Sequence, residues 1–178
     1  MDTSQLHKKN APESVRFAIV TVSSSRYKKY GNISKPDQAE DVSGQVISNL
    51  LGNSGFEITK YSLLPDNKAQ IRRFIQDLTS SDIQAIVISG GTGLAPEDVT
   101  LEAVEPLFNK TIPGFGEFFR QKSLVDVGTA ALLSRAAAGI VDTCVVFCLP
   151  GSPAAVELGV KELIIPEAGH ILKHISQD

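Results

Sequence analysis

The sequence lacks several features that mark specialised classes of protein. It has two cysteines in 178 residues, Cys144 and Cys148, which are too few for a disulfide framework or a four-ligand zinc site. No apolar stretch approaches the roughly 18 residues that a bilayer-spanning helix needs, and the first ten residues contain no apolar region of a secretion signal. The formal net charge of −3 is not the basic excess typical of nucleic-acid-binding proteins. We therefore expect a cytoplasmic protein that binds neither nucleic acid nor a membrane.

The composition itself is that of a folded protein. Apolar residues make up 42% of the chain and charged residues 21%, and the length fits one domain. Residues 1–14 are polar, which predicts a flexible arm followed by a single domain over residues 15–178.

Short β-branched apolar runs alternate with segments of helical periodicity. We expect strands at residues 15–22, 56–64, 85–88 and 145–149, and helices at 42–51, 71–78, 101–108, 115–121, 130–135 and 156–164. Residues 23–40 are polar and contain Gly31 and Pro36, which predicts a long loop. This alternation predicts an α/β domain with a mostly parallel sheet and helices on both of its faces.

Two glycine-rich loops follow two of the predicted strands. They are Ser89-Gly90-Gly91-Thr92-Gly93 and Pro150-Gly151-Ser152-Pro153. Binding crevices of parallel sheets lie beyond the carboxyl ends of the strands, and glycines leave backbone N–H groups open to an anion. The first loop lacks the lysine of a Walker loop and the spacing of a dinucleotide fingerprint. Each loop alone is compatible with a plain turn or helix cap, but together they indicate a phosphate-bearing ligand.

Two aspartates stand near these loops or at a helix start. Asp98 follows the first glycine loop, and a carboxylate beside bound phosphates is suited to hold Mg²⁺. Asp41 precedes the predicted helix at residues 42–51. For both residues the alternative interpretation is a helix cap.

Two other residue pairs are interpreted as structural. Cys144 and Cys148 lie four residues apart in a predicted strand and are interpreted as core residues. His170 and His174 have helical spacing, but they lack the glutamate of a His-Glu-x-x-His motif and are interpreted as structural.

Five motifs occur in a characteristic order. They are Ser89-Gly90-Gly91-Thr92-Gly93, Pro96-Glu97-Asp98-Val99-Thr100, Ile112-Pro113-Gly114-Phe115-Gly116-Glu117, Leu133-Ser134-Arg135-Ala136 and Leu149-Pro150-Gly151-Ser152-Pro153. In this order they strongly resemble the MogA/MoaB family of molybdenum-cofactor biosynthesis proteins, relatives of the gephyrin G domain. The resemblance covers roughly residues 15–165.

The resemblance implies a three-layer α/β/α fold and a homo-oligomer, either a trimer or a hexamer. It implies a reaction in which molybdopterin and Mg-ATP give adenylylated molybdopterin and pyrophosphate, before molybdate or tungstate is inserted. Molybdopterin and ATP would then be the small-molecule partners, with Mg²⁺ as cofactor. Other proteins of cofactor biosynthesis are further possible partners.

The resemblance also implies roles for individual residues. Asp41 and Asp98 match the two active-site aspartates of the family and are assigned to the metal. The nucleotide and its phosphates are expected at Ser23, Ser24, Gly90, Gly91, Thr92, Gly93, Thr100, Pro150, Gly151 and Ser152. The pterin is expected at Glu117, Ser134 and Arg135.

One residue departs from the family pattern. Many active members have a basic residue just before the motif aspartate, whereas this chain has Glu97. This departure favours an alternative function, a non-catalytic molybdopterin-binding or scaffold protein on the same fold. Asp98 and Thr100 match the active pattern and favour the enzyme. A general α/β nucleotide hydrolase is a third interpretation, with support only at the level of the fold.

Overall fold

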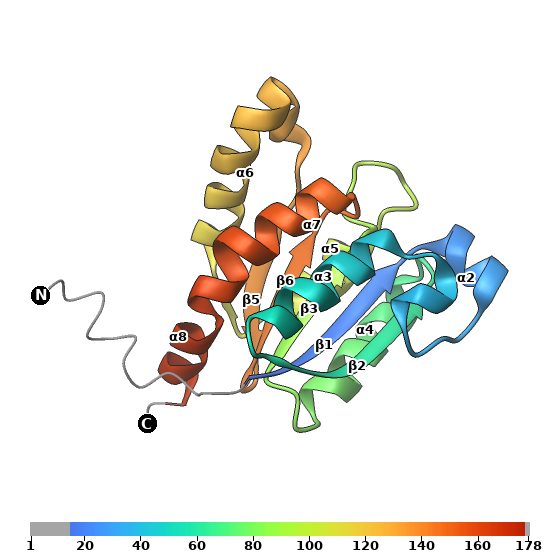
Figure 1. The fold of residues 1–178 in the computed structure, drawn as a ribbon, viewed down its shortest axis with the longest axis horizontal. Coiled ribbons are helices and arrows are strands. Elements are labelled where there is room, and N and C mark those ends of the chain that lie inside the picture. Colours follow the sequence, from blue (N-terminus) through green and yellow to red (C-terminus); the bar gives the residue numbers. More distant parts are fainter. Residues whose placement is uncertain (1–14, 177–178) are drawn as a thin grey trace, which may run out of the picture.

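A computed structural model describes residues 15–176 (Figure 1). The arm predicted at residues 1–14 lies outside the described residues. In the described part of the chain, no helix has both the length and the apolar character needed to cross a bilayer.

Six strands form one sheet in the order β2-β1-β3-β6-β5-β4. The strands are β1 Arg16–Val22, β2 Glu57–Leu64, β3 Ala85–Ser89, β4 Lys110–Thr111, β5 Ala137–Val141 and β6 Cys144–Leu149. The pairs β1–β2, β1–β3 and β3–β6 are parallel, whereas β5 is antiparallel to both β4 and β6. The mostly parallel sheet is therefore confirmed, and β4 and β5 are additions to the four predicted strands.

Helices connect the strands and cover both faces of the sheet (Figure 1). They are α2 Ser24–Tyr30, α3 Val42–Asn53, α4 Lys68–Thr79, α5 Thr100–Val104, α6 Pro113–Val127, α7 Pro153–Gly159 and α8 Ile165–Ile175, with 3-10 turns η1 Pro36–Ala39, η2 Glu105–Leu107 and η3 Gly128–Leu133 and a π-helical segment η4 Val160–Ile164. Local sequence explains several helix starts. Asn67 caps α4 by accepting a hydrogen bond from the Gln70 N–H at 3.0 Å, and Ser152 caps α7 by accepting one from the Ala155 N–H at 3.2 Å.

Two predictions for local structure are wrong. Residues 23–40 are not a plain loop, because they form α2 and η1. None of the α2 residues is buried, so the segment has no apolar stripe that could have revealed a helix. Residues 130–135 are not an α-helix, because the 3-10 turn η3 ends at Leu133 and leaves Ser134 and Arg135 beyond it.

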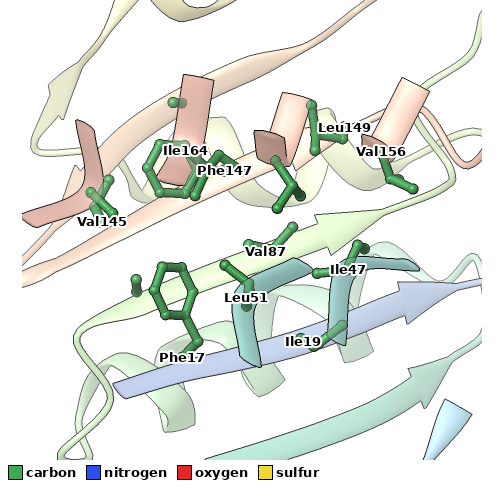
Figure 2. Close-up of a cluster of buried hydrophobic side chains, with 14 of the residues drawn as sticks. Phe17, Ile19, Ile47, Leu51, Val87, Val145, Phe147, Leu149, Val156 and Ile164 are labelled. Carbon is green, nitrogen blue, oxygen red and sulfur yellow. The ribbon is translucent and has the colours of Figure 1, made fainter. Parts of the chain in front are cut away.

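The core forms two clusters, one on each face of the sheet. Alternate residues of the central strands point to opposite faces, so Phe17 and Ile19 of β1 pack with Leu51 of α3 in one cluster, as Figure 2 shows. Ala18 and Val20 pack in the other cluster, which includes Ile71 and Ile75 of α4. This arrangement confirms the three-layer α/β/α fold.

Both cysteines lie in the core, as predicted. Cys144 and Cys148 belong to β6 and are fully buried in the cluster that contains α4. Burial raises the pKa of the Cys144 thiol to about 12, and it also raises the pKa of Cys148. Thiols in this state are unreactive, so their contribution is packing.

Candidate functional site

The candidate site lies at the edge of the sheet where the parallel strands end. After β1 the chain continues to β2 at one end of the strand order, and after β3 it continues to β4 at the other end. The strand order therefore reverses direction between the neighbouring strands β1 and β3. The loops after β1, β3 and β6 therefore meet at this edge. The Gly90 N–H donates to the Leu149 carbonyl at 3.1 Å, which joins the loop after β3 to the last residue of β6.

Both glycine loops line one pocket of about 330 Å³. Its lining consists of Gly90, Gly91, Thr92, Gly93, Asp98, Ala130, Leu133, Ser134, Arg135, Pro150 and Gly151. The structure thus brings together residues assigned to phosphate, metal and pterin, from segments that lie as far apart in sequence as Gly90 and Gly151. This convergence is the arrangement on which the predicted chemistry depends.

The loop after β3 has a backbone that favours glycine. Gly90 and Gly91 have φ values of 94° and 62°, in the left-handed region, and a Cβ at Gly90 would collide with the carbonyl oxygen of Val22. Thr100 is fully buried and holds this loop. Its hydroxyl donates to the Gly90 carbonyl at 2.8 Å, and its N–H donates to the Gly91 carbonyl at 2.9 Å. Thr100 therefore fixes the conformation of the loop from its buried side.

Asp98 lies in the pocket wall and does not cap a helix. Its carboxylate oxygen Oδ2 accepts a hydrogen bond from the Ala95 N–H at 3.1 Å, and its own N–H donates to the Ala95 carbonyl at 2.9 Å. The residue before α5 is Val99, and no side-chain cap hydrogen bond is present there. The alternative interpretation of Asp98 as a cap is therefore wrong, and the carboxylate is held beside Gly93.

Arg135 brings a fixed positive charge to the same wall. Its Nε donates to the Thr92 carbonyl at 2.9 Å, and its Nη2 donates to the two carboxylate oxygens of Glu102 at 2.8 and 3.0 Å. Burial is the largest single effect on Glu102 and raises its pKa. The hydrogen bond from Arg135, a backbone hydrogen bond and the positive charges of Arg135 and Lys68 together outweigh it and hold the pKa of Glu102 below its usual range. The pair therefore ties α5 to the glycine loop.

Asp41 occupies a different environment. It is 1% exposed, and its Oδ2 accepts hydrogen bonds from the hydroxyls of Thr21 at 2.6 Å and Tyr61 at 2.8 Å. Burial raises the pKa of Tyr61, and the hydrogen bond to Asp41 adds to this effect. Asp41 precedes α3 but makes no side-chain cap hydrogen bond, and it does not line the pocket.

The first turn of α3 nevertheless reaches the site through another residue. The Ser43 hydroxyl donates to the Gly151 carbonyl at 2.7 Å. This bond holds the loop after β6 in place. Ser152, which caps α7, is not among the pocket-lining residues.

Ser23 follows β1 and caps α2, and Ser24 is the first residue of that helix. Ser24 contacts an acidic residue that the sequence does not single out. The Ser24 N–H donates to Oδ2 of Asp66 at 2.8 Å, and the Ser24 hydroxyl accepts from the Asp66 N–H at 2.8 Å. A Cβ built on Gly91 would lie 2.9 Å from Oδ1 of Asp66. Asp66 thus stands against the glycine loop. Its position just beyond the end of β2 was the available signal.

Glu117 lies in a neighbouring hollow. It lines a pocket of about 240 Å³ together with Arg120, and Arg120 also lines a pocket of about 330 Å³ that includes Ser134 and Arg135. These shared residues place the three hollows next to one another. Glu117 therefore lies in a neighbouring hollow, apart from the glycine loops.

The donor set at this edge fits a magnesium ion better than a zinc ion. Within residues 15–176, no three His, Cys, Asp or Glu side chains are grouped so as to hold a metal by themselves. Asp98 and Asp66 offer carboxylate oxygens, and Mg²⁺ is commonly held by one or two carboxylates together with substrate phosphates. The residues present are compatible with a metal that arrives with a phosphate-bearing substrate.

Comparison with known proteins identifies the family. Residues 18–170 match the family model described as a probable molybdopterin binding domain. The chain belongs to this family. Molybdenum cofactor biosynthesis protein B of Bacillus subtilis is 39% identical over 176 residues, which cover 98% of each chain. The protein of the same name from Bacillus cereus is 42% identical over 167 residues, or 93% of each chain.

Solved structures show the same fold in relatives of this molybdopterin-binding family. The tungsten cofactor synthesizing protein MoaB from Pyrococcus furiosus has a TM-score of 0.82 and 38% identity, over 94% of this chain and 100% of that one. A MogA structure has a TM-score of 0.77 and 27% identity, over 90% of this chain and 99% of that one. The predicted membership of the MogA/MoaB family is therefore confirmed.

Proposed function

We propose that this protein acts in molybdenum or tungsten cofactor biosynthesis by transferring the adenylyl group of ATP to molybdopterin. The names of the relatives support the pathway. The observation that carries the reaction is the single pocket that contains both glycine loops, Asp98 and Arg135.

The reaction joins two phosphate groups. The terminal phosphate oxygen of molybdopterin attacks the α-phosphorus of ATP, a new P–O bond forms, the bond to the β-phosphate breaks, and pyrophosphate leaves. The attacking oxygen is already an anion, so no strong base is required. The main difficulty is to bring several negative charges together, which favours a site made of N–H donors and cations.

The pocket offers what this difficulty demands. Backbone N–H groups of the two glycine loops are candidates to bind phosphate oxygens, and their positions are set by Thr100 and Ser43. Arg135 is held by Thr92 and Glu102, so its positive charge is oriented before substrate binds. A site arranged in advance lowers the cost of reorganisation during the reaction.

Asp98 is the residue that we assign to Mg²⁺ and to the geometry of the phosphates. When bound, Mg²⁺ would offset the charge on the phosphate oxygens. Asp66 is the second carboxylate at this edge, and we assign it to the nucleotide side of the site. Asp41 was matched to the metal, but its buried bonds to Thr21 and Tyr61 support a role in positioning the start of α3.

The pterin is assigned to the hollows next to the glycine-loop pocket. Ser134 and Arg135 line both the glycine-loop pocket and the next hollow, and Glu117 lines the hollow beyond. This placement would leave the terminal phosphate of molybdopterin near Asp98.

We also propose that copies of this chain associate through the end of α6 and η3. In Figure 1 the end of α6 stands away from the sheet. The exposed large apolar side chains at the end of α6 and in η3 are Leu124, Val125, Val127, Leu132 and Leu133, and Phe118 is exposed earlier in α6. An apolar patch of this kind is typical of a protein interface. Because Leu133 also lines the pocket, a second copy would border the site.

The decisive assay combines the protein with molybdopterin, ATP and Mg²⁺. The proposal predicts stoichiometric formation of adenylylated pterin and pyrophosphate. Pyrophosphate must not appear when the pterin is omitted, since ATP turnover without pterin would indicate a general nucleotide hydrolase.

A second function is favoured by one observation. Glu97 is exposed next to Asp98 and adds negative charge where many active relatives carry a basic residue. A non-catalytic molybdopterin-binding protein would bind the pterin but release no pyrophosphate in the same assay. Replacing Glu97 by Lys or Gln should raise the transfer rate if its charge restrains the enzyme.

A further inference from the structure

A pair of histidines lies at the edge of the sheet opposite the glycine loops. His170 and His174 belong to α8, and His174 lines a hollow with Ile140 at the end of β5 and Asp142 just before β6. Because β6 runs parallel to β1 and β3, its start marks the amino edge of the sheet. The proposed adenylyl transfer does not use this pair.

The two imidazoles approach each other through their Nε2 atoms. The Nε2 atoms of His170 and His174 are 3.0 Å apart. On the other side of the His170 ring, Nδ1 lies 3.1 Å from Oε2 of Glu167. The His170 side chain is 28% exposed, and His174 is an exposed residue, so solvent reaches the pair.

These contacts define which nitrogen of His170 can act as a ligand. When Glu167 accepts a proton-bearing Nδ1, the neutral imidazole carries its lone pair on Nε2. A carboxylate on the far nitrogen is the usual outer partner of a metal-bound histidine, where it fixes the tautomer and the ring orientation. Two nitrogens bound to one ion at roughly 2.0–2.1 Å are themselves about 3 Å apart. The observed Nε2–Nε2 distance of 3.0 Å matches this separation.

We propose that His170 and His174 bind one divalent transition-metal ion through their two Nε2 atoms, with Glu167 orienting His170. Imidazole suits Zn²⁺, Ni²⁺ and Cu²⁺, whereas Mg²⁺ prefers oxygen ligands, so this site is chemically distinct from the one assigned to Asp98. The described residues offer no group of three metal-ligating side chains, so water would complete the coordination.

The competing explanation is a simple hydrogen bond, in which one Nε2–H donates to the other Nε2. It requires opposite tautomers in the two rings and predicts no metal affinity. The metal site predicts that both rings carry the proton on Nδ1 once the ion is bound.

The test uses the full-length, untagged protein and Zn²⁺ alone. Calorimetric titration should show one zinc ion per chain, and two-dimensional nitrogen–proton spectra of the imidazoles should show both Nε2 signals shifting. His174→Gln and His170→Gln should each weaken zinc binding by at least ~10-fold, and Glu167→Gln by about 10-fold. His7→Gln is the matched control, because His7 is the remaining histidine of the three, and it should bind zinc like the wild type.

Three results would overturn the proposal. They are the absence of zinc binding, equal binding by a folded His174→Gln variant, and a site that depends on His7. Failure here is separable from failure of the proposed function, because adenylyl transfer is expected to be unchanged in His174→Gln.

Discussion

Asp98 and Asp41 are the same residue type in two regions with opposite surroundings. Asp98 stands in the wall of a pocket, with a backbone N–H of Ala95 as the partner of its Oδ2. Asp41 is buried under the start of α3, and one of its oxygens accepts two hydroxyl hydrogen bonds. A carboxylate that faces a pocket can exchange its partners for a ligand, whereas one that holds two buried hydroxyls cannot do so without a cost in stability.

This contrast separates chemistry from architecture at one edge of the sheet. The pocket that contains Asp98 is lined largely by loop backbone and by charged side chains held in place. The buried contacts of Asp41 stabilise the start of α3. The contrast also bears on the choice between an adenylyltransferase and a non-catalytic molybdopterin-binding protein. Only the adenylyltransferase requires the Asp98 carboxylate to act on a reacting phosphate.

The largest expected effect comes from Asp98→Asn. It removes the charge that we assign to Mg²⁺ while keeping the size of the side chain. We expect the rate of adenylyl transfer to fall at least ~100-fold, about 2.7 kcal/mol of activation free energy, with an unchanged unfolding midpoint. Asp77→Asn, on the exposed face of α4, is the matched control and should turn over normally. Near-normal turnover in Asp98→Asn would remove Asp98 from the mechanism.

The next effect is on stability, from Asp41→Ala. It leaves the buried hydroxyls of Thr21 and Tyr61 without their acceptor, so we expect the free energy of unfolding to fall by about 2–4 kcal/mol. Urea unfolding measures this loss. Transfer per folded molecule should change less than that of Asp98→Asn. A stable Asp41→Asn variant with a 100-fold slower transfer would instead make Asp41 a metal ligand.

Thr100→Val tests whether the glycine loop needs its support. The substitution keeps the shape of the buried side chain but removes the hydroxyl that donates to the Gly90 carbonyl. We expect about 1 kcal/mol lower stability and roughly 10-fold slower transfer, since the loop would lose a fixed position. Thr59→Val is a control, because its hydroxyl donates to Phe17 far from the site. Equal rates in both variants would contradict the proposed support.

The smallest effect concerns pH and the pair of Glu102 with Arg135. The pKa of Glu102 is lower in the folded protein than its ordinary value of 4.5, so ionised Glu102 contributes stability above that value. This contribution is lost as the pH falls through the lowered pKa. Wild type should therefore exceed Glu102→Gln slightly in stability at pH 7, and the difference should disappear in acid. A difference that does not shrink as the pH falls below 4.5 would exclude this pair as its source.

Most of the fold could be predicted from the sequence because most of its elements have a clear hydrophobic pattern. The buried strands β1, β3 and β6 are nearly continuous apolar runs, and α3, α4 and α7 have an apolar stripe or a clear cap. Helix α2 was missed because it buries no residue, and β5 because its Ala-Ala-Gly sequence gives no strand pattern.

The site was predictable in part, for a related reason. The glycine loops and Asp98 follow strands and carry a motif, so their convergence could be expected. Asp66 was missed because an aspartate between Pro65 and Asn67 is equally typical of a turn or a helix cap. Which of two aspartates faces a ligand depends on tertiary contacts, such as those of Asp41 with Thr21 and Tyr61, and sequence spacing does not contain them.

The central claim is that the two glycine loops are the walls of one phosphate-binding pocket. A crystal structure of the protein with AMP and molybdopterin tests it most directly. We predict that the phosphates lie between the loops at Gly91 and Gly151, within about 3 Å of backbone N–H groups and beside Asp98. A nucleotide bound elsewhere, such as the hollow of about 680 Å³ between α3 and β2, would contradict the account.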